Sequence, residues 1–308
     1  MHTPLRSTRA AYNPTMPTTI LELIEHGAAQ LQAAGVAYGH GTTNAFDEAA
    51  WLVLWTLQMP PDDLDLVKNK PVSAVDIAQA ASIIIARISS RKPAAYLTNE
   101  AWLQGVPFYV DERAIVPRSF IAELLTSGAI DPWLSDEHTH TALDLCTGNG
   151  SLAVLAAMTY PDVQVTGADL SKDALEVAKI NVTRHALQER ITLIESDGLQ
   201  QCGVYDLILC NPPYVNATSM AVLPAEYQAE PVMALASGTD GMDFTRTLLK
   251  TAASHMREHA VLVLEIGNER ANFEAAFPRL EPIWLETSAG EDQVLLLTRE
   301  QLEMSRSV

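Results

Sequence analysis

The second half of the chain alternates short apolar runs with amphipathic stretches, and this alternation limits the possible folds more than any other feature. The apolar runs predict buried strands, whereas the stretches between them carry apolar residues at helical spacing. Strands that alternate with helices predict an α/β, doubly wound and mostly parallel sheet. The predicted strands are TALDLC, VQVTGAD, RITLIES, YDLILC, AVLVLEIG and DQVLLLT, and the predicted helices span residues 151–159, 172–185, 243–258 and 269–276. Such sheets bind ligands at the carboxyl ends of their strands, near the point where the strand order reverses.

The 308 residues are long for one domain, and the pattern changes along them. Residues 17–92 predict a small helical domain of three helices, because apolar residues recur there at spacings of three and four. Residues 93–120 change to strand-like residues with turn signals, which predicts a linking β-hairpin before the sheet domain at residues 121–308. Residues 1–16 lack the apolar segment of a secretory signal, and we predict a disordered tail there.

The chain is acidic, with a formal net charge of −18. Binding to nucleic acid relies on clustered Lys and Arg, so no stable nucleic-acid partner is expected. An acidic surface suits a basic protein partner, or it serves solubility alone. The three cysteines form no CxxC pair, which favours the reducing cytoplasm. The sequence contains no apolar run long enough to predict a membrane span, and its scattered histidines predict no metal site.

A glycine-rich turn joins the first predicted strand to the next helix in LDLCTGNGSLAVLAA. Gly148 and Gly150 remove side chains where a backbone must approach a ligand, and Asp169 ends the next strand, where an acid can accept ribose hydroxyls. The spacing G-x-G-x-x-A also allows a nicotinamide dehydrogenase. However, Asp144 lies inside the end of the first strand, and an acid pointing into the site suits a cationic ligand such as S-adenosyl-L-methionine, with Asp197 placed to reach adenine. The predicted cofactor-binding residues are Asp144, Cys146, Thr147, Gly148, Gly150, Asp169, Leu170, Asp197 and Asn211.

The segment NPPY directly follows the fourth predicted strand, and Asn211, Pro212, Pro213 and Tyr214 are the predicted catalytic residues. Asn-Pro is also an ordinary turn signal. The functional interpretation follows from the chemistry of an amide nitrogen, whose lone pair is delocalised and attacks a methyl group poorly unless its hydrogens are held by two acceptors. Asn211 can supply one acceptor and a proline carbonyl the other, while Tyr214 offers a flat face for stacking. This chemistry fits any planar carbon that bears an NH2 group, in an adenine ring or in a glutamine side chain.

Together these motifs resemble the protein-(glutamine-N5) methyltransferase family. The segments DLCTGNG, GADLS, NPPYVN, EYQAEP, ALASGTDG and LEIGN match its landmarks in order. Upstream, AAYLTNEAWLQGVPFYVDERAIVPRS resembles the branch that methylates large-subunit ribosomal protein three, because the chain has PRSFIAEL where the release-factor branch has PRPETE.

The resemblance implies a Rossmann-like class I S-adenosylmethionine-dependent methyltransferase fold. It implies that Gly148, Gly150 and Asp169 bind the donor, that the NPPY residues hold the glutamine amide, and that the helical domain and the hairpin grip the protein substrate. Phe120 departs from the branch, which usually has a second proline at this position near the expected path of the substrate. A release-factor methyltransferase, a nucleic-acid exocyclic-amine methyltransferase and a non-enzymatic ribosome assembly factor remain as alternatives.

Overall fold

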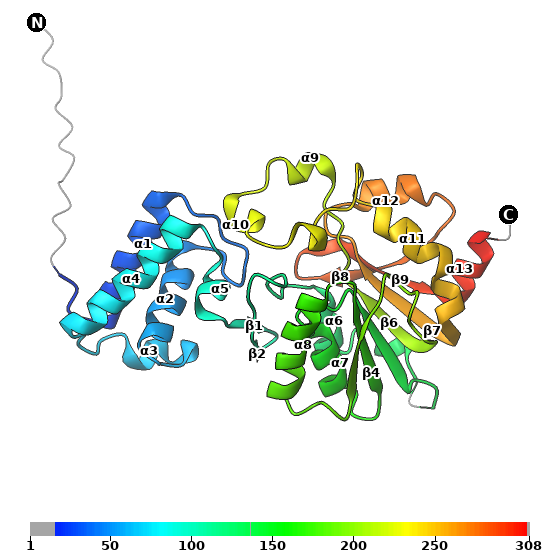
Figure 1. The fold of residues 1–308 in the computed structure, drawn as a ribbon, viewed down its shortest axis with the longest axis horizontal. Helices are drawn as coiled ribbons and strands as arrows, with labels where there is room; N and C mark the ends of the chain where they lie inside the picture. Colours follow the sequence, from blue (N-terminus) through cyan, green and yellow to red (C-terminus); the bar gives the residue numbers. More distant parts are fainter. Residues whose placement is uncertain (1–15, 136, 307–308) are drawn as a thin grey trace, which may run out of the picture. The chain divides into compact units, whose positions relative to one another are not determined.

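The computed structural model describes residues 16–135 and 137–306, so the predicted tail lies outside the described residues except for Met16. The described chain divides into two compact units (Figure 1). One comprises residues 16–36 and 42–90, and the other comprises residues 37–41 and 91–306. None of the helices among the described residues is long and apolar enough to cross a membrane.

The first unit is helical. Its elements are α1 (Ile20–Ala34), α2 (Ala45–Thr56), η1 (Pro61–Asp63), α3 (Leu64–Val67) and α4 (Ala74–Ser90). Helix α1 starts with a capping box, in which the Thr19 side chain accepts from the backbone of Glu22 and the Glu22 carboxylate accepts from the backbone of Thr19. Inside the unit, Arg87 is fully buried and donates to Glu48 over 2.8 Å. The three long helices match the three apolar patterns, and α3 and η1 are additional short elements.

The second unit contains a seven-stranded sheet of order β5-β4-β3-β6-β7-β9-β8. The first five strands are parallel neighbours, and β9 pairs antiparallel with both β7 and β8. The doubly wound, mostly parallel α/β fold is thereby confirmed. The strands are β3 (Thr141–Leu145), β4 (Gln164–Asp169), β5 (Ile191–Glu195), β6 (Tyr205–Cys210), β7 (Met256–Glu265), β8 (Ile283–Thr287) and β9 (Gly290–Thr298).

A short antiparallel hairpin of β1 (Ala101–Leu103) and β2 (Val106–Phe108) precedes the sheet. The helices of this unit are α5 (Ala94–Thr98), α6 (Ile121–Ser127), α7 (Ser151–Thr159), α8 (Lys172–Arg184), α9 (Ala217–Met220), α10 (Ala225–Gln228), α11 (Asp243–Thr251), α12 (Arg270–Ala276) and α13 (Arg299–Arg306), with short 3-10 turns η2 (Asp131–Trp133), η3 (Val232–Ala234) and η4 (Ala252–His255).

Two predictions about these elements were wrong in detail. The helix predicted for residues 243–258 ends at Thr251 and is followed by η4, and β7 already begins at Met256, because this buried residue pairs with Tyr205 of β6. Strand β8 was not predicted at all. It lies at the edge of the sheet and, among the strands of residues 16–135 and 137–306, pairs only with β9, so its residues are partly exposed and show little of a buried strand's apolar pattern.

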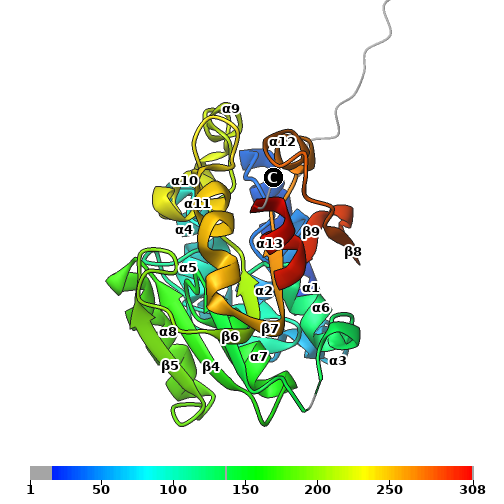
Figure 2. The same ribbon diagram turned by 90° about the vertical axis from the view of Figure 1, so that its right-hand side faces the viewer.

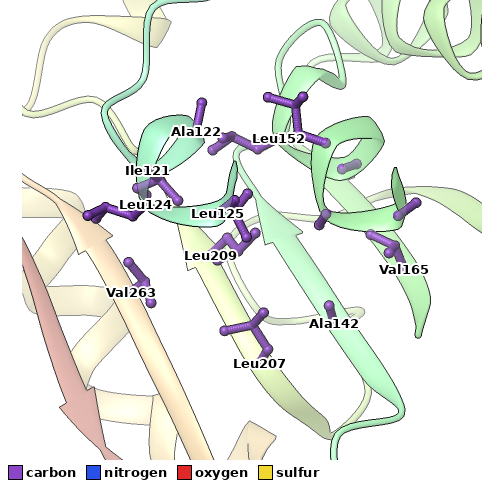
Figure 3. Packing of buried hydrophobic residues seen from close by; sticks show 14 of the residues in the cluster. Ile121, Ala122, Leu124, Leu125, Ala142, Leu152, Val165, Leu207, Leu209 and Val263 are labelled. Atoms are coloured by element: carbon purple, nitrogen blue, oxygen red, sulfur yellow. The ribbon is translucent and has the colours of Figure 1, made fainter. Parts of the chain in front are cut away.

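Apolar side chains cover both faces of this sheet. On one face, Leu124 and Leu125 of α6 pack with Leu207 and Leu209 of β6 and with Val263 of β7 (Figure 3). The other face is covered by α11, α12 and α13, whose apolar residues join the alternate side chains of β3, β6 and β7 (Figure 2). Because both faces are buried, these strands consist mainly of apolar residues, and the polar residues of a site lie at their carboxyl ends.

Candidate functional site

A cavity lies where the strand order reverses, at the carboxyl ends of β3, β4 and β6. The predicted residues that line it are Cys146, Gly148, Asp169, Leu170, Asp197, Asn211 and Pro213. The other predicted residues lie outside its lining, namely Asp144, Thr147, Gly150, Pro212 and Tyr214. The structure therefore brings the glycine loop, Asp169, Asn211 and Pro213 to one cavity, whereas the remaining predicted residues do not line it.

The loop after β3 is shaped by its glycines. Gly148 and Gly150 have φ angles of 55° and 79°, which disfavour residues with a side chain. A Cβ on Gly150 would lie 3.0 Å from the Cβ of Ala178 in α8, so the absence of a side chain also lets α7 and α8 approach each other. The backbone N–H of Thr147 donates to the carbonyl of Ala168, which holds the loop against β4.

Asp144 faces this loop from behind, and its side chain is 1% exposed. Its Oδ2 accepts from the Thr147 hydroxyl over 2.5 Å and from the Ala153 N–H over 2.9 Å. Burial raises the pKa of Asp144 to about 7, since few donors compensate the lost hydration. Oδ2 thus binds the glycine loop and the first turn of α7, whereas Oδ1 has no hydrogen-bond partner among the described residues, and a direct contact of this carboxylate with a ligand stays a prediction.

Asp169 lies at the end of β4 and does line the cavity. Its Oδ1 accepts from the Ser171 N–H over 2.8 Å and its Oδ2 accepts from the Gly148 N–H over 2.9 Å. Burial raises the pKa of this carboxyl group, although these backbone donors oppose the shift. A carboxylate oxygen can accept two hydrogen bonds, so each oxygen still has a lone pair for a ligand hydroxyl.

The rest of the lining suits a nucleoside. Leu170 is 51% exposed beside Asp169, and Ile115, Met233 and Phe244 add apolar surface. An acid with free lone pairs next to exposed apolar side chains fits the ribose and the adenine of S-adenosyl-L-methionine. Ile115, Met233 and Phe244 were not predicted as site residues. They come from a loop, from η3 and from α11, and no local pattern distinguishes them from ordinary apolar positions.

Asn211 directly follows β6, whose last residue Cys210 pairs with Leu145 of β3 on one side and with Leu264 of β7 on the other. This register places Asn211 at the centre of the sheet's carboxyl edge. Among the described residues, none forms a hydrogen bond with the Asn211 side chain, so its amide is available to a ligand. The adjacent Pro213 also lines the cavity.

The remainder of the NPPY loop is held by the segment that follows η3. The Val215 N–H donates to the carbonyl of Leu235 over 2.8 Å, and the Ser237 N–H donates to the carbonyl of Val215 over 3.0 Å. Gly241 lies against the carbonyl oxygen of Tyr214 so closely that any side chain there would collide with it. The SGTDG segment thus supports the loop through its backbone.

Tyr214 is held from the β7 side by residues that were not predicted. Its hydroxyl donates to Oε1 of Glu265 over 3.2 Å, and Gly267 lies beside its ring. Burial raises the pKa of the Tyr214 hydroxyl, and the nearby Glu265 carboxylate raises it further. Oε2 of Glu265 accepts from the hydroxyl of Ser119 and from the N–H of Phe120. The only sequence signal for this contact is an acid at the end of an apolar strand in LEIGN.

Arg118 pairs with Glu230 across the same unit. Its two terminal nitrogens donate to the two Glu230 oxygens over 2.6 and 2.8 Å, and Nε2 of His40 lies 3.4 Å from that carboxylate. Burial acts to raise the pKa of Glu230, but Arg118 and His40 outweigh it and bring the pKa down to about 2. This ion pair joins the PRS segment to the EYQAEP segment, whereas the Phe120 side chain packs against the hydrophobic cluster around α6. The described residues contain no group of three or more His, Cys, Asp or Glu side chains that could hold a metal ion.

Comparison with known proteins adds the family. The profile described as "Methyltransferase small domain" matches residues 127–227. The ribosomal protein uL3 glutamine methyltransferase of Bordetella pertussis is 51% identical over 287 residues, which cover 92% of this chain and 96% of that protein. Proteins of the same name are 48% identical in Burkholderia pseudomallei, over 94% of this chain and 97% of theirs, and 41% identical in Bradyrhizobium diazoefficiens, over 92% of each. With such identity over nearly the full length, the chain belongs to the family of ribosomal protein uL3 glutamine methyltransferases.

Proposed function

We propose that this enzyme methylates the side-chain amide nitrogen, N5, of a glutamine in ribosomal protein uL3. The methyl donor is S-adenosyl-L-methionine, which supplies a methyl group on a positively charged sulfur. The observation that carries the proposal is that Asn211 and Pro213 line the same cavity as Gly148 and Asp169. An acceptor amide held by the NPPY loop would therefore meet the donor directly.

The donor would be held by the strand ends. The Asp169 carboxylate would accept the ribose hydroxyls with the lone pairs that Gly148 and Ser171 leave free. Leu170 would cover the adenine with apolar surface, and Asp197, which lines the cavity, would accept from the adenine amino group. Asp144 would act indirectly, because its bonds to Thr147 and Ala153 keep the glycine loop in place.

The acceptor amide would be held by Asn211 and its neighbours. The Asn211 Oδ1 would accept one N–H of the glutamine, and the carbonyl of Pro212 would accept the other, which aims the nitrogen at the methyl group. Tyr214 would present a ring face to the planar amide. Positioning supplies most of the acceleration in such a site, and no strong base is needed because an N-methylated amide cation loses its proton readily.

The charge of the chain supports a basic protein as the substrate. Ribosomal proteins contact RNA phosphates and carry Lys and Arg for this purpose. With its net charge of −18, this protein would attract such a substrate and repel free nucleic acid. We place the reaction in the cytoplasm, where ribosomes are assembled.

The test is a transfer assay with isotope-labelled methyl donor. Purified uL3, a release factor and ribosomal RNA are offered in separate reactions, and modified protein is mapped by mass spectrometry. We expect label in uL3 alone, on one glutamine. Label confined to the release factor would move the enzyme to the other branch of the family, and label confined to RNA would refute amide transfer altogether.

A further inference from the structure

Glu265 is a buried acid for which the donor and acceptor sites described above provide no direct role. It ends β7, is 2% exposed, and pairs in register with Val294 of β9. Its Oε2 accepts from Ser119 Oγ over 2.6 Å and from the Phe120 N–H over 2.9 Å. Its Oε1 accepts from the Tyr214 hydroxyl over 3.2 Å.

A carboxylate at this position is costly for the fold. Burial raises the pKa of Glu265, and the hydrogen bonds that it accepts only partly offset the loss of hydration. An apolar residue of similar volume would fill the same place in the core without that cost. The contribution of this carboxylate is therefore to position the groups that it binds.

Those groups belong to the catalytic loop and to the segment before α6. The Tyr214 ring has two restraints, since its hydroxyl is bound by Glu265 and its edge lies against Gly267, where a Cβ would come within 2.5 Å of Cε2. Both restraints come from the same strand end, two residues apart. Ser119 completes the arrangement, because its Oγ accepts from the Ile121 N–H while its hydroxyl donates to Glu265.

We propose that Glu265 is a positioning residue for methyl transfer, which fixes the position of the Tyr214 ring and with it the placement of the acceptor amide. This inference rests on the proposed function. Glu265 touches neither donor nor acceptor in this arrangement, and it acts through Tyr214. It should therefore control the rate of transfer and leave donor binding unchanged.

The decisive variants are Glu265→Leu, Glu265→Gln and Tyr214→Phe, assayed for uL3 methylation and for donor binding by equilibrium dialysis. Glu265→Leu removes every acceptor, and we expect kcat to fall roughly tenfold or more with an unchanged donor Kd, since a small misorientation has a large effect on rate. Glu265→Gln should restore most of the rate, because its oxygen can accept from Ser119 and Phe120 while its NH2 donates to the Tyr214 oxygen. The matched control is Glu258→Leu, which changes an exposed acid of the same strand and should keep full activity.

Two results would overturn the inference. One is a Tyr214→Phe variant with the parent's kcat. It would show that the hydrogen bond from the Tyr214 hydroxyl to Glu265 does not affect methyl transfer, even if Glu265→Leu does not fold. The other is a Glu265→Leu variant whose loss lies wholly in donor Kd. Fluorine NMR of fluorotyrosine-labelled protein, with Tyr214 assigned by Tyr214→Phe, gives a readout that needs no substrate: we expect one environment of the Tyr214 ring in the parent and exchange between two in Glu265→Leu.

The same experiment separates this inference from the proposed function. If the parent methylates uL3 and the Glu265 variants match it, only the positioning role is wrong. If the parent does not methylate uL3, the proposed function is wrong, and the NMR comparison still decides whether Glu265 fixes the Tyr214 ring.

Discussion

Gly267 lies directly against the ring of Tyr214: a Cβ on Gly267 would be 2.5 Å from Cε2 of that ring. The two residues are far apart in sequence, and they meet because β6 and β7 are neighbours whose carboxyl ends lie at the same edge. The glycine in LEIGN is thus explained by the tyrosine in NPPY.

Gly267→Ala should reduce methyl transfer and stability together. Gly267 has a φ of 53°, so alanine adds backbone strain of about 1–2 kcal/mol, and its methyl group pushes Tyr214 away from its position. Gly105→Ala is the matched control, because Gly105 also has a positive φ but has no atom within 4 Å of the added Cβ. Urea unfolding should show a loss in both variants, while only Gly267→Ala should lose transfer rate. Equal activity of the two variants would contradict this account.

Asn211→Ala should nearly abolish methyl transfer, by roughly a hundredfold or more, because one of two amide acceptors is lost. Donor binding, measured by equilibrium dialysis, should be largely retained, since Asp169 and the glycine loop are untouched. Asn216→Ala controls for the loop itself: Asn216 accepts from the Ser219 N–H and donates to Glu269, and it is a structural residue of the same segment. An Asn211→Ala enzyme as active as the parent would eliminate the amide clamp.

Asp144 should make stability fall as the pH rises. Its pKa is about 7 in the folded state against an ordinary value of 3.8, so the folded protein holds this proton more tightly than the unfolded chain. Its contribution therefore declines as the pH rises from about 4 to 7 and is constant above that. Asp144→Asn keeps an acceptor for Thr147 and Ala153 without this titration. We expect the parent to lose free energy of unfolding relative to Asp144→Asn between pH 5 and pH 8, and a constant difference would refute the assignment.

Arg118→Met should destabilise the protein by about 3 kcal/mol at pH 7, because it leaves the Glu230 carboxylate buried with only partial compensation from His40 and the Val116 N–H. The folded-state pKa of Glu230 is about 2, below its ordinary 4.5, so the pair's contribution is complete above about pH 4.5 and is lost as the pH falls toward 2. Urea unfolding at pH 5 and pH 3 should therefore show that the parent and Arg118→Met differ less in their free energy of unfolding at pH 3 than at pH 5. Arg246→Met, which breaks a more exposed pair with Asp240, should cost less than about 1 kcal/mol.

Local patterns in the sequence were sufficient to predict the central sheet and the residues of the donor and acceptor parts of the site. The spacing of apolar residues that predicts a strand or a helix is a pattern among residues close in sequence. The alternation of strands with helices then predicts the parallel sheet. Because parallel strands end at one edge, Gly148, Asp169 and Asn211 could be assigned to one site before any contact was known. Strand β8 escaped detection because an edge strand has no continuous apolar pattern.

The contacts that orient the site were decided only by the tertiary structure. Nothing local to Asp144 indicates that its carboxylate accepts from the Thr147 hydroxyl and the Ala153 N–H. Arg118 meets Glu230 across 112 residues, and Ser119 meets Glu265 across 146, so neither pairing follows from a repeat or a spacing. The sequence by itself determined which residues stand at the strand ends. Their partners depended on how the sheet and the long loops bring distant segments together, because a side chain's hydrogen bonds are set by distance in space rather than along the chain.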